Sequence, residues 1–282
     1  MKKANTIKKN YKIKPIIRWA GGKNWLTKYI ENFIPKDFNN YHEPFIGGAS
    51  IYIYLKSKGL IKQNSYLSDL NQELILTYKI IQNDPDSIIN ILNKLKNTKD
   101  FYYKIRKSKP KNDIEIASRF LYLNKTSFNG LYRVNKKGEY NVPYGYRKSN
   151  NLFDFINIKR LSLLLNDKKT YIFNTSFEET IKNIKKRDLV FLDPPYTVAH
   201  GNNGFIEYNE LIFTWQHQIK LADLIEKINK IGAYYIMTNA AHSSILKLFS
   251  GLGKKYDLER FSSIGGKNAK RQKIKEYIFT NV

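Results

Sequence analysis

The sequence predicts an α/β fold built on a mostly parallel sheet, and three stretches support this prediction. Residues 189–192 form a continuous apolar run that is too short for a helix, as in a strand buried on both faces. Residues 41–55 read as strand, glycine turn and helix, and an amphipathic helix over 215–231, ended by Gly232, precedes an apolar strand at 233–237. Strands that alternate with helices in this way are typical of parallel sheets.

Length and charge set the broad class of the protein. The 282 residues suffice for one large α/β domain or for a domain with an insert. Lysine and arginine number 49 against 24 aspartates and glutamates, and the formal charge of +25 predicts a polyanionic partner. Because a Lys- and Asn-rich composition can also reflect genome bias, the placement of the charge matters more than its sum.

Several classes of site are excluded or disfavoured. Cysteine is absent, which excludes disulfides, thiolate metal sites and a cysteine nucleophile. The histidines, His42, His200, His217 and His242, lack the spacing of metal ligands, so we predict no metal site. The N-terminus has no apolar signal core, and no stretch approaches the ~18 apolar residues of a membrane span. We therefore expect a cytoplasmic, nucleoid-associated protein without membrane contact.

The N-terminal part predicts a nucleoside site. We expect a loose basic arm over 1–14, then a glycine pair and Lys23 before a helix at 25–30, which could bind an anion or form a plain loop. Gly47 and Gly48 follow the strand near 41, and Asp69 ends a second strand at 65–71. In such a βαβ unit the glycines approach the ligand and the acid binds ribose hydroxyls. The glycines do not match G-x-G-x-x-G, which argues against NAD and for a smaller nucleoside.

Residues 72–152 differ in character, being basic, aromatic and helical. Asp84 and Pro85 are typical of a helix start, and a second helix is predicted over 114–123. Runs at 128–134 and 139–144 flank a turn and predict a hairpin, which either enters a major groove or is simply an exposed charged turn. We predict a target-recognition domain over 72–152, inserted into a discontinuous catalytic domain of residues 1–71 and 153–282.

The C-terminal half completes the sheet. We expect a strand at 171–177, a helix near 178–185 and a mobile loop over 197–213 that closes over substrate. Strands at 256–261 and 276–280 are predicted to form an antiparallel edge pair. The loop between them carries Lys267, Lys270, Arg271 and Lys273.

The turn Asp193-Pro194-Pro195-Tyr196 follows the buried strand at 189–192 and is the candidate catalytic site. The prolines stop the strand, so the turn's carbonyl groups lack ladder partners and can accept hydrogen bonds from a ligand. A planar ring with an NH2 group could stack on Tyr196 and donate to the Asp193 carboxylate and the Pro194 carbonyl. The alternative is a Pro-Pro turn of the kind that can follow any core strand.

With these motifs placed, the sequence closely resembles the Dam-like, D12-class DNA adenine-N6 methyltransferases of the α order, from about residue 18 to residue 280. The resemblance rests on several motifs in order, namely 18–23, 43–48, 68–71, 128–135, 141–145 and 193–196. It implies a Rossmann-like class I methyltransferase sheet, S-adenosylmethionine as methyl donor, and double-stranded DNA from which the target adenine is flipped.

The resemblance also implies roles for individual residues. Trp19, Lys23, Phe45 and Gly47 would surround the methionine part of the cofactor, and Phe177 its adenine. Phe128 would fill the vacated base stack. The expected cofactor contacts are Trp19, Ala20, Gly21, Gly22, Lys23, Pro44, Phe45, Gly47, Gly48, Ser50, Asp69, Leu70, Ser176, Phe177 and Asp193. The expected DNA contacts are Arg18, Phe128, Asn129, Leu131, Arg133, Asn141, Pro143, Lys267, Lys270 and Arg271.

These residues predict direct methyl transfer to a flipped adenine, with catalysis by Asp193, Pro194, Pro195 and Tyr196. A GATC-containing site is the first expectation. Because residues 197–205 and Arg18 depart from many GATC enzymes, the longer site of a restriction-associated methyltransferase stays open, with a cognate restriction endonuclease as partner. An RNA or protein amine as substrate, and a catalytically silent DNA-binding module, also remain alternatives. We expect a monomer or a weak dimer.

Overall fold

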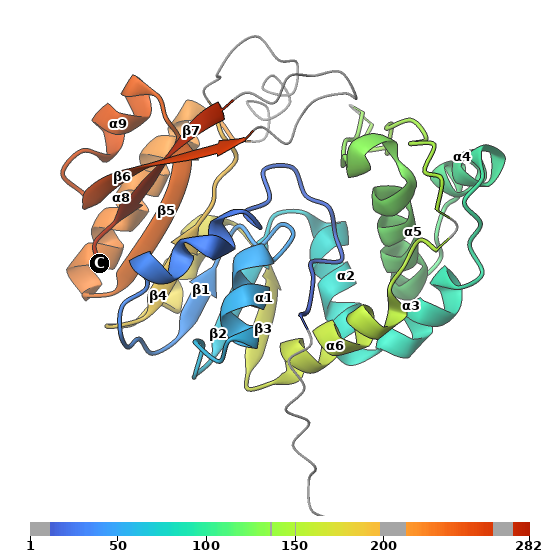
Figure 1. Ribbon diagram of the computed structural model, residues 1–282, viewed down its shortest axis with the longest axis horizontal. Helices are drawn as coiled ribbons and strands as arrows, with labels where there is room; N and C mark the ends of the chain where they lie inside the picture. Colours follow the sequence, from blue (N-terminus) through green and yellow to red (C-terminus); the bar gives the residue numbers. More distant parts are fainter. Residues whose placement is uncertain (1–11, 136, 150, 198–212, 262–272) are drawn as a thin grey trace, which may run out of the picture.

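A computed structural model describes residues 12–135, 137–149, 151–197, 213–261 and 273–282. Within these ranges seven strands form one sheet, in the order β3-β2-β1-β4-β5-β7-β6 (Figure 1). The strands are β1 Tyr41–Glu43, β2 Ser65–Asp69, β3 Thr170–Asn174, β4 Leu189–Leu192, β5 Tyr234–Ala240, β6 Lys254–Phe261 and β7 Lys273–Thr280. Strands β1 to β5 pair in parallel, whereas β7 is antiparallel to both β5 and β6. The predicted parallel α/β sheet and its antiparallel edge pair are confirmed.

Helices surround this sheet and extend it on one side. The α-helices are α1 Ser50–Ser57, α2 Gln72–Asn83, α3 Pro85–Leu92, α4 Lys99–Lys107, α5 Asp113–Thr126, α6 Phe155–Asn166, α8 Trp215–Ile231 and α9 Ser243–Phe249. Short 3-10 helices are η1 Leu26–Lys28, η2 Ile30–Phe33, η3 Phe128–Gly130 and η4 Phe177–Lys182. None of these described helices is long and apolar enough to cross a membrane.

Capping side chains set the ends of the helices. The Asp84 side chain accepts a hydrogen bond from the Ser87 N–H, and Pro85 occupies the first turn of α3, as predicted. At the far end of α8, Gly232 adopts the left-handed conformation with φ of 76°, so the predicted bounds of this helix are confirmed. At these two positions the local sequence was enough to predict the end of the helix.

Two predicted helices are wrong in type. The segment expected as a helix over 25–30 forms the two 3-10 turns η1 and η2, and Trp25 at its start provides no capping hydrogen bond. The helix expected near 178–185 is the 3-10 helix η4. The preceding strand ends at Asn174 rather than continuing to 177, and the Asn174 side-chain amide donates to the carbonyls of Asp69 and Leu70 there.

The predicted hairpin over 128–144 turns back on itself without forming two strands. Among the described residues the segment has two isolated bridges, Ser127 to Tyr144 and Val134 to Tyr140. Asn129 at its start has a left-handed φ of 54°, and proline at 143 has no N–H to donate. The segment is therefore a turn held at separate points and not a regular two-stranded ribbon.

Helices α3, α4 and α5 lie together beside the sheet, at the side of α2 (Figure 1). Helix α2 packs on β2 and β3 and also on α5 and α6, so this first helix of the segment 72–152 lies directly against the sheet. Apolar side chains fill a core on each face of the sheet, and one core continues into the insert through Leu74 and Phe120. The parallel strands β1, β2 and β4 thus end at one edge of the sheet, beside the insert.

Candidate active site

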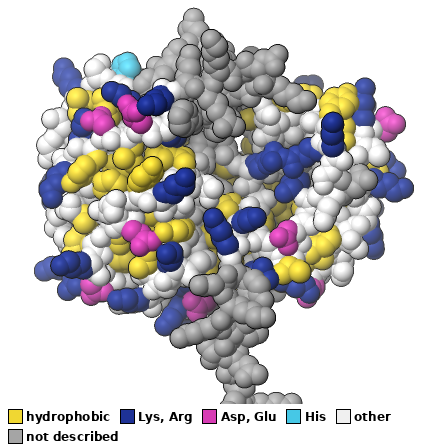
Figure 2. Space-filling view, viewed as in Figure 1, with side chains coloured by type: hydrophobic (Ala, Val, Ile, Leu, Met, Phe, Trp, Pro, Cys, Tyr) yellow, Lys and Arg dark blue, Asp and Glu magenta, His cyan; other side chains and the backbone are white. Residues whose placement is uncertain are grey.

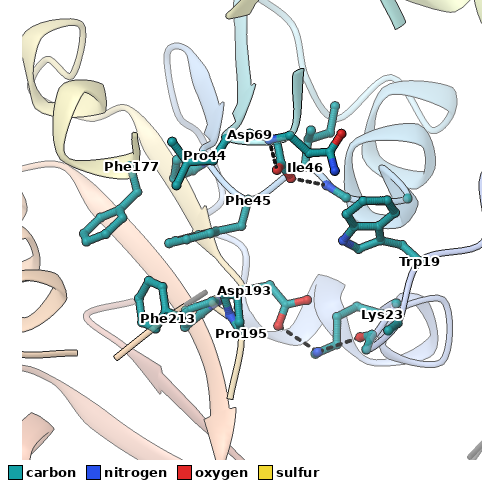
Figure 3. Close-up of a pocket in the computed structure, with 18 of the residues that line it drawn as sticks. Trp19, Lys23, Pro44, Phe45, Ile46, Asp69, Phe177, Asp193, Pro195 and Phe213 are labelled. Carbon is teal, nitrogen blue, oxygen red and sulfur yellow. Dashed lines mark hydrogen bonds and ion pairs between the residues drawn. The ribbon is translucent and has the colours of Figure 1, made fainter. Parts of the chain in front are cut away.

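A cavity of about 1020 Å³ lies at the carboxyl ends of β1, β2 and β4 (Figure 3). Parallel α/β sheets bind ligands at this edge, because loops there can carry polar groups that the strands cannot. The cavity brings together every residue in the expected cofactor set and the whole Asp193-Pro194-Pro195-Tyr196 turn. Their individual roles remain predictions.

Gly47 packs tightly against Trp19 at one wall of the cavity. A Cβ atom at position 47 would lie 2.5 Å from Cδ1 of Trp19, and Gly47 has a left-handed φ of 42°. The Trp19 ring in turn stacks on Tyr132 of the insert, with ring centroids 5.7 Å apart. Glycine is thus required here both for its conformation and for its small size.

Asp69 holds the glycine turn by its backbone. One carboxylate oxygen, Oδ2, accepts from the Gly47 N–H at 3.1 Å, and Oδ1 accepts from the Asn71 N–H at 3.0 Å. Burial raises the pKa of Asp69 to about 6, although these backbone hydrogen bonds oppose the rise. The group is therefore largely ionised at pH 7 and can accept further hydrogen bonds from a ligand.

Aromatic rings form the apolar end of the cavity. The rings of Phe45 and Phe177 stack with centroids 5.3 Å apart, and Phe213 meets Phe45 edge-on at 5.8 Å (Figure 3). The sequence placed Phe213 only at the end of an expected mobile loop, so its contribution to this wall was missed. That loop, apart from its first and last residues, lies outside the described residues.

Asp193 is paired with Lys23 at the opposite wall. The Lys23 ammonium lies 2.7 Å from Oδ1 of Asp193 and donates to the Gly21 carbonyl at 2.8 Å (Figure 3). The hydroxyl of Thr238 donates to the same Asp193 oxygen at 2.7 Å. Burial raises the pKa of Asp193, and the Lys23 charge opposes the rise. The pairing links the Gly-Gly-Lys segment directly to the candidate catalytic carboxylate.

Two buried glutamates near this turn were missed from the sequence. Tyr196 donates its hydroxyl to Glu276 at 2.8 Å, and Arg260 also donates to Glu276. Glu43 ends β1 and accepts from the Tyr41 hydroxyl at 2.6 Å, and burial raises its pKa to about 8. For Glu276 the available signal was a charged residue directly before the apolar run 277–279 of β7.

The predicted DNA-reading residues lie around the turn that follows α5. Phe128 is 49% exposed, which suits a side chain that meets DNA. The guanidinium of Arg133 donates through Nε to Oδ1 of Asn141 at 2.8 Å, and the Pro143 carbonyl accepts from the Phe128 N–H. Lys267, Lys270 and Arg271 lie outside the described residues.

The buried side chain of Asn124 joins the Arg18 segment to the turn that follows α5. The sequence did not single out this residue. It accepts from the Arg18 N–H at 2.9 Å and donates to the carbonyls of Arg18 at 2.7 Å and Gly130 at 3.1 Å. Gly130 has φ of 65°, and a Cβ there would lie 2.5 Å from Cδ of Arg18. An asparagine on the apolar face of a helix was the only signal in the sequence.

Lysine and arginine side chains gather along the middle of the face seen in Figure 2, between the sheet and helices α3, α4 and α5. This placement supports the polyanionic partner predicted from the overall charge of +25, because clustered basic residues beside a cavity favour binding of a polyanion. The cavity, the Asp193-Pro194-Pro195-Tyr196 turn and the basic surface occur together on one molecule.

Comparison with known sequences identifies the class. A family model of D12 class N6 adenine-specific DNA methyltransferases matches residues 19–269. The chain belongs to this class of enzymes. This chain is 38% identical over 263 residues to the Type II methyltransferase M.MjaIII of Methanocaldococcus jannaschii, and the match covers 86% of this chain and 90% of the relative. It is 30% identical to M1.LlaDCHI of Lactococcus lactis over 98% of this chain and 99% of the relative.

Relatives named DNA adenine methylase are also similar. This chain is 29% identical to the DNA adenine methylase of Haemophilus influenzae, over 98% of this chain and 96% of the relative. The predicted family, the Rossmann-like methyltransferase sheet and the adenine-specific DNA methyltransferase activity are thereby confirmed.

Proposed function

We propose that this enzyme transfers a methyl group from S-adenosylmethionine directly to the N6 amine of an adenine flipped out of duplex DNA. The observation that carries the proposal is the placement of two carboxylates, Asp69 and Asp193, on one cavity of about 1020 Å³. Such a volume has room for a nucleoside cofactor beside a flipped base.

The residues present fit S-adenosylmethionine, which supplies an electrophilic methyl group when bound. The glycine at position 47 leaves room for a ligand beside Trp19, and the ionised Asp69 suits ribose hydroxyls. The rings of Phe45 and Phe177 offer faces for an adenine. The remaining predicted contacts, from Trp19 to Lys23 and from Pro44 to Ser50, border the same space.

The catalytic turn would act on the target amine. The Asp193 carboxylate and the Pro194 carbonyl accept its two N–H bonds, which leaves the nitrogen lone pair free for the methyl carbon. Tyr196 provides a flat surface for the base, and flipping costs a few kcal/mol of stacking. No covalent enzyme intermediate is required, and orientation of the two reactants supplies much of the rate.

DNA reading would fall to the turn after α5 and to the basic segments. Arg133, held by Asn141, can bond both acceptors of a guanine edge, and Phe128 can fill the gap left by the flipped base. Arg18, Asn129, Leu131 and Pro143 are further candidate base contacts. The loop cations Lys267, Lys270 and Arg271 would neutralise phosphates.

A GATC-containing site is our first proposal, and a longer site is the second. The longer site rests on residues 197–205 and Arg18, which depart from many GATC enzymes. Relatives named Type II methyltransferases support a cognate restriction endonuclease as a further partner. We also propose that residues 72–152 act as the recognition unit, and that the enzyme is a monomer or weak dimer.

The decisive experiment maps N6-methyladenine in genomic DNA from cells that express the wild-type enzyme or the Asp193→Asn variant. We expect methylation of one short sequence in the first sample and strongly reduced methylation of that sequence in the second. A parallel assay with DNA, RNA and protein acceptors separates the remaining substrate classes. Transfer to RNA or protein without transfer to DNA would refute the proposed substrate.

A further inference from the structure

Four charged side chains meet behind the candidate catalytic turn. Lys23 and Glu276 have side chains only 3% and 1% exposed, and Asp193 and Arg260 are 18% and 15% exposed. The four come from the N-terminal segment, the turn after β4, and strands β6 and β7. Buried charges of this kind are tolerated only when they are paired, and here two cations face two carboxylates.

Glu276 occupies the centre of this cluster. It accepts from Arg260 through one oxygen and from the Tyr196 hydroxyl at 2.8 Å through the other. Its Oε2 atom also lies 4.0 Å from the Lys23 ammonium, which is itself 5.0 Å above the Tyr196 ring. Lys23 thus stands between two carboxylates, closer to Asp193 than to Glu276.

We propose that Glu276 is a positioning residue for methyl transfer, which fixes the Tyr196 ring and gives the Lys23 ammonium a second carboxylate when Asp193 engages the target amine. This inference rests on the proposed role of Asp193 as acceptor. A small shift of the ammonium toward Glu276 weakens its hold on Asp193 without leaving a buried cation unpaired. The Tyr196 hydroxyl stays bound meanwhile, so the stacking surface keeps its orientation.

The charges around Asp193 give this proposal a pH signature. Among the described residues, Asp193 is faced by Lys23, Glu276, Glu43 and Tyr196, and Arg260 lies behind Glu276. Burial raises the pKa of Asp193, Lys23 lowers it, and the Glu276 charge adds to the rise. Because Asp193 must be ionised to accept from the amine, Glu276→Gln should move the acid limb of the rate profile to lower pH.

The test compares single-turnover methylation by Glu276→Gln with that by Glu259→Gln. Glu259 lies on β6, where its side chain is 52% exposed and pairs with Lys273, so it is a matched control outside the cluster. We expect Glu276→Gln to slow transfer by up to roughly 10²-fold, as when a reacting group is displaced by about 1 Å. Affinities of Glu276→Gln for S-adenosylmethionine and for cognate duplex should match those of the wild type, and the single-turnover rate and acid limb of Glu259→Gln should also be those of the wild type.

A second variant keeps the test informative if Glu276→Gln folds poorly. Tyr196→Phe removes the hydroxyl that Glu276 holds and changes no charge, so this variant alone should slow transfer while the affinity for S-adenosylmethionine stays at the wild-type value. Where Glu276→Gln folds, it should cost less in the Tyr196→Phe background than in the wild type. The role of Glu276 would be overturned if Glu276→Gln left the transfer rate unchanged or did not move the acid limb of the rate profile. The same cost of Glu276→Gln in both backgrounds would also overturn it. A wild-type rate for Asp193→Asn would instead refute the proposed function.

Discussion

The Lys23 ammonium lies 2.7 Å from Oδ1 of Asp193, and the Thr238 hydroxyl donates to the same oxygen. Because both contacts fall on Oδ1, the second oxygen of this carboxylate is the one that can accept from a substrate. The Lys23 charge also lowers the pKa of Asp193 and so opposes the effect of burial. A carboxylate that is fixed in orientation and stabilised in its charged form is what acceptance from an amine requires.

Replacement of Asp193 by asparagine should reduce methyl transfer while leaving cofactor binding largely intact. The change keeps the shape and removes a charged acceptor, and loss of one such preorganised group typically costs ~10²–10³ in rate. Single-turnover assays give the rate, and calorimetry gives the cofactor affinity. Turnover within a few-fold of the wild type would show that the amine is bound elsewhere.

Affinity for S-adenosylmethionine should fall as pH decreases through about 6, the raised pKa of Asp69. Above this pH the group is a carboxylate and accepts from ribose hydroxyls, whereas below it the protonated acid accepts more weakly. Titration calorimetry from pH 5 to 8 would measure the slope, and Asp69→Asn should flatten it. At pH 8, Asp69→Ala should weaken binding by roughly 1.5–3 kcal/mol. If the affinity for S-adenosylmethionine did not depend on Asp69, the ribose would have to bind elsewhere.

Gly47→Ala should destabilise the protein more than Gly59→Ala, although both glycines have a positive φ. Position 59 has open space, so its cost is the ~1–2 kcal/mol of a left-handed residue with a Cβ. At position 47 the new atom would also meet the Trp19 ring at 2.5 Å. Denaturant unfolding would compare the two variants. We expect cofactor affinity to fall only for Gly47→Ala, and equal effects would contradict the tight contact.

Arg133→Ala should cost about 1–3 kcal/mol on the cognate duplex and change binding to scrambled DNA very little. The reason is that a guanidinium reads a guanine edge only when the correct base is present. Asn141→Ala should lose part of the same specificity, since its Oδ1 orients the Nε of Arg133. Fluorescence titrations with both duplexes measure the difference, and equal losses on the two would exclude base reading by Arg133.

Removal of the basic side chains Lys267, Lys270 or Lys273 should weaken binding to all sequences alike. Each lost phosphate contact lowers the dependence of affinity on salt by about one counterion. Titrations of each variant over a salt series provide the slopes. A sequence-dependent loss for any of these lysines would assign it to base recognition instead.

Local sequence predicted the elements whose signals are short in range. Periodicity, proline and capping act over a few residues. They predicted the apolar run before Asp193, the bounds of α8 and the start of α3 at Asp84. The glycine turn at Gly47 and the acid at Asp69 were expected to share one site. In the structure a hydrogen bond joins them.

The contacts that fix the site could not be predicted, because they join distant parts of the chain. Glu276 reaches Tyr196 across 80 positions, and Asn124 reaches Arg18 across 106. A buried acid or amide on an apolar face signals that some partner exists, yet it carries no information on which partner. The hairpin was wrong in detail for a related reason, since its bridges depend on how the turn packs on the end of α5.

The hydrogen bonds between Asn124 and Arg18 predict a thermodynamic link between two binding events. Arg18 is a candidate base contact, and its neighbour Trp19 packs on Gly47, in the turn that we propose binds the cofactor. An ordering of this backbone by one ligand therefore benefits the other, and linkage requires that each ligand raise the other's affinity by the same factor. The enzyme should thus bind cognate DNA more tightly when its methyl donor is in place, and Asn124→Ala should uncouple the two.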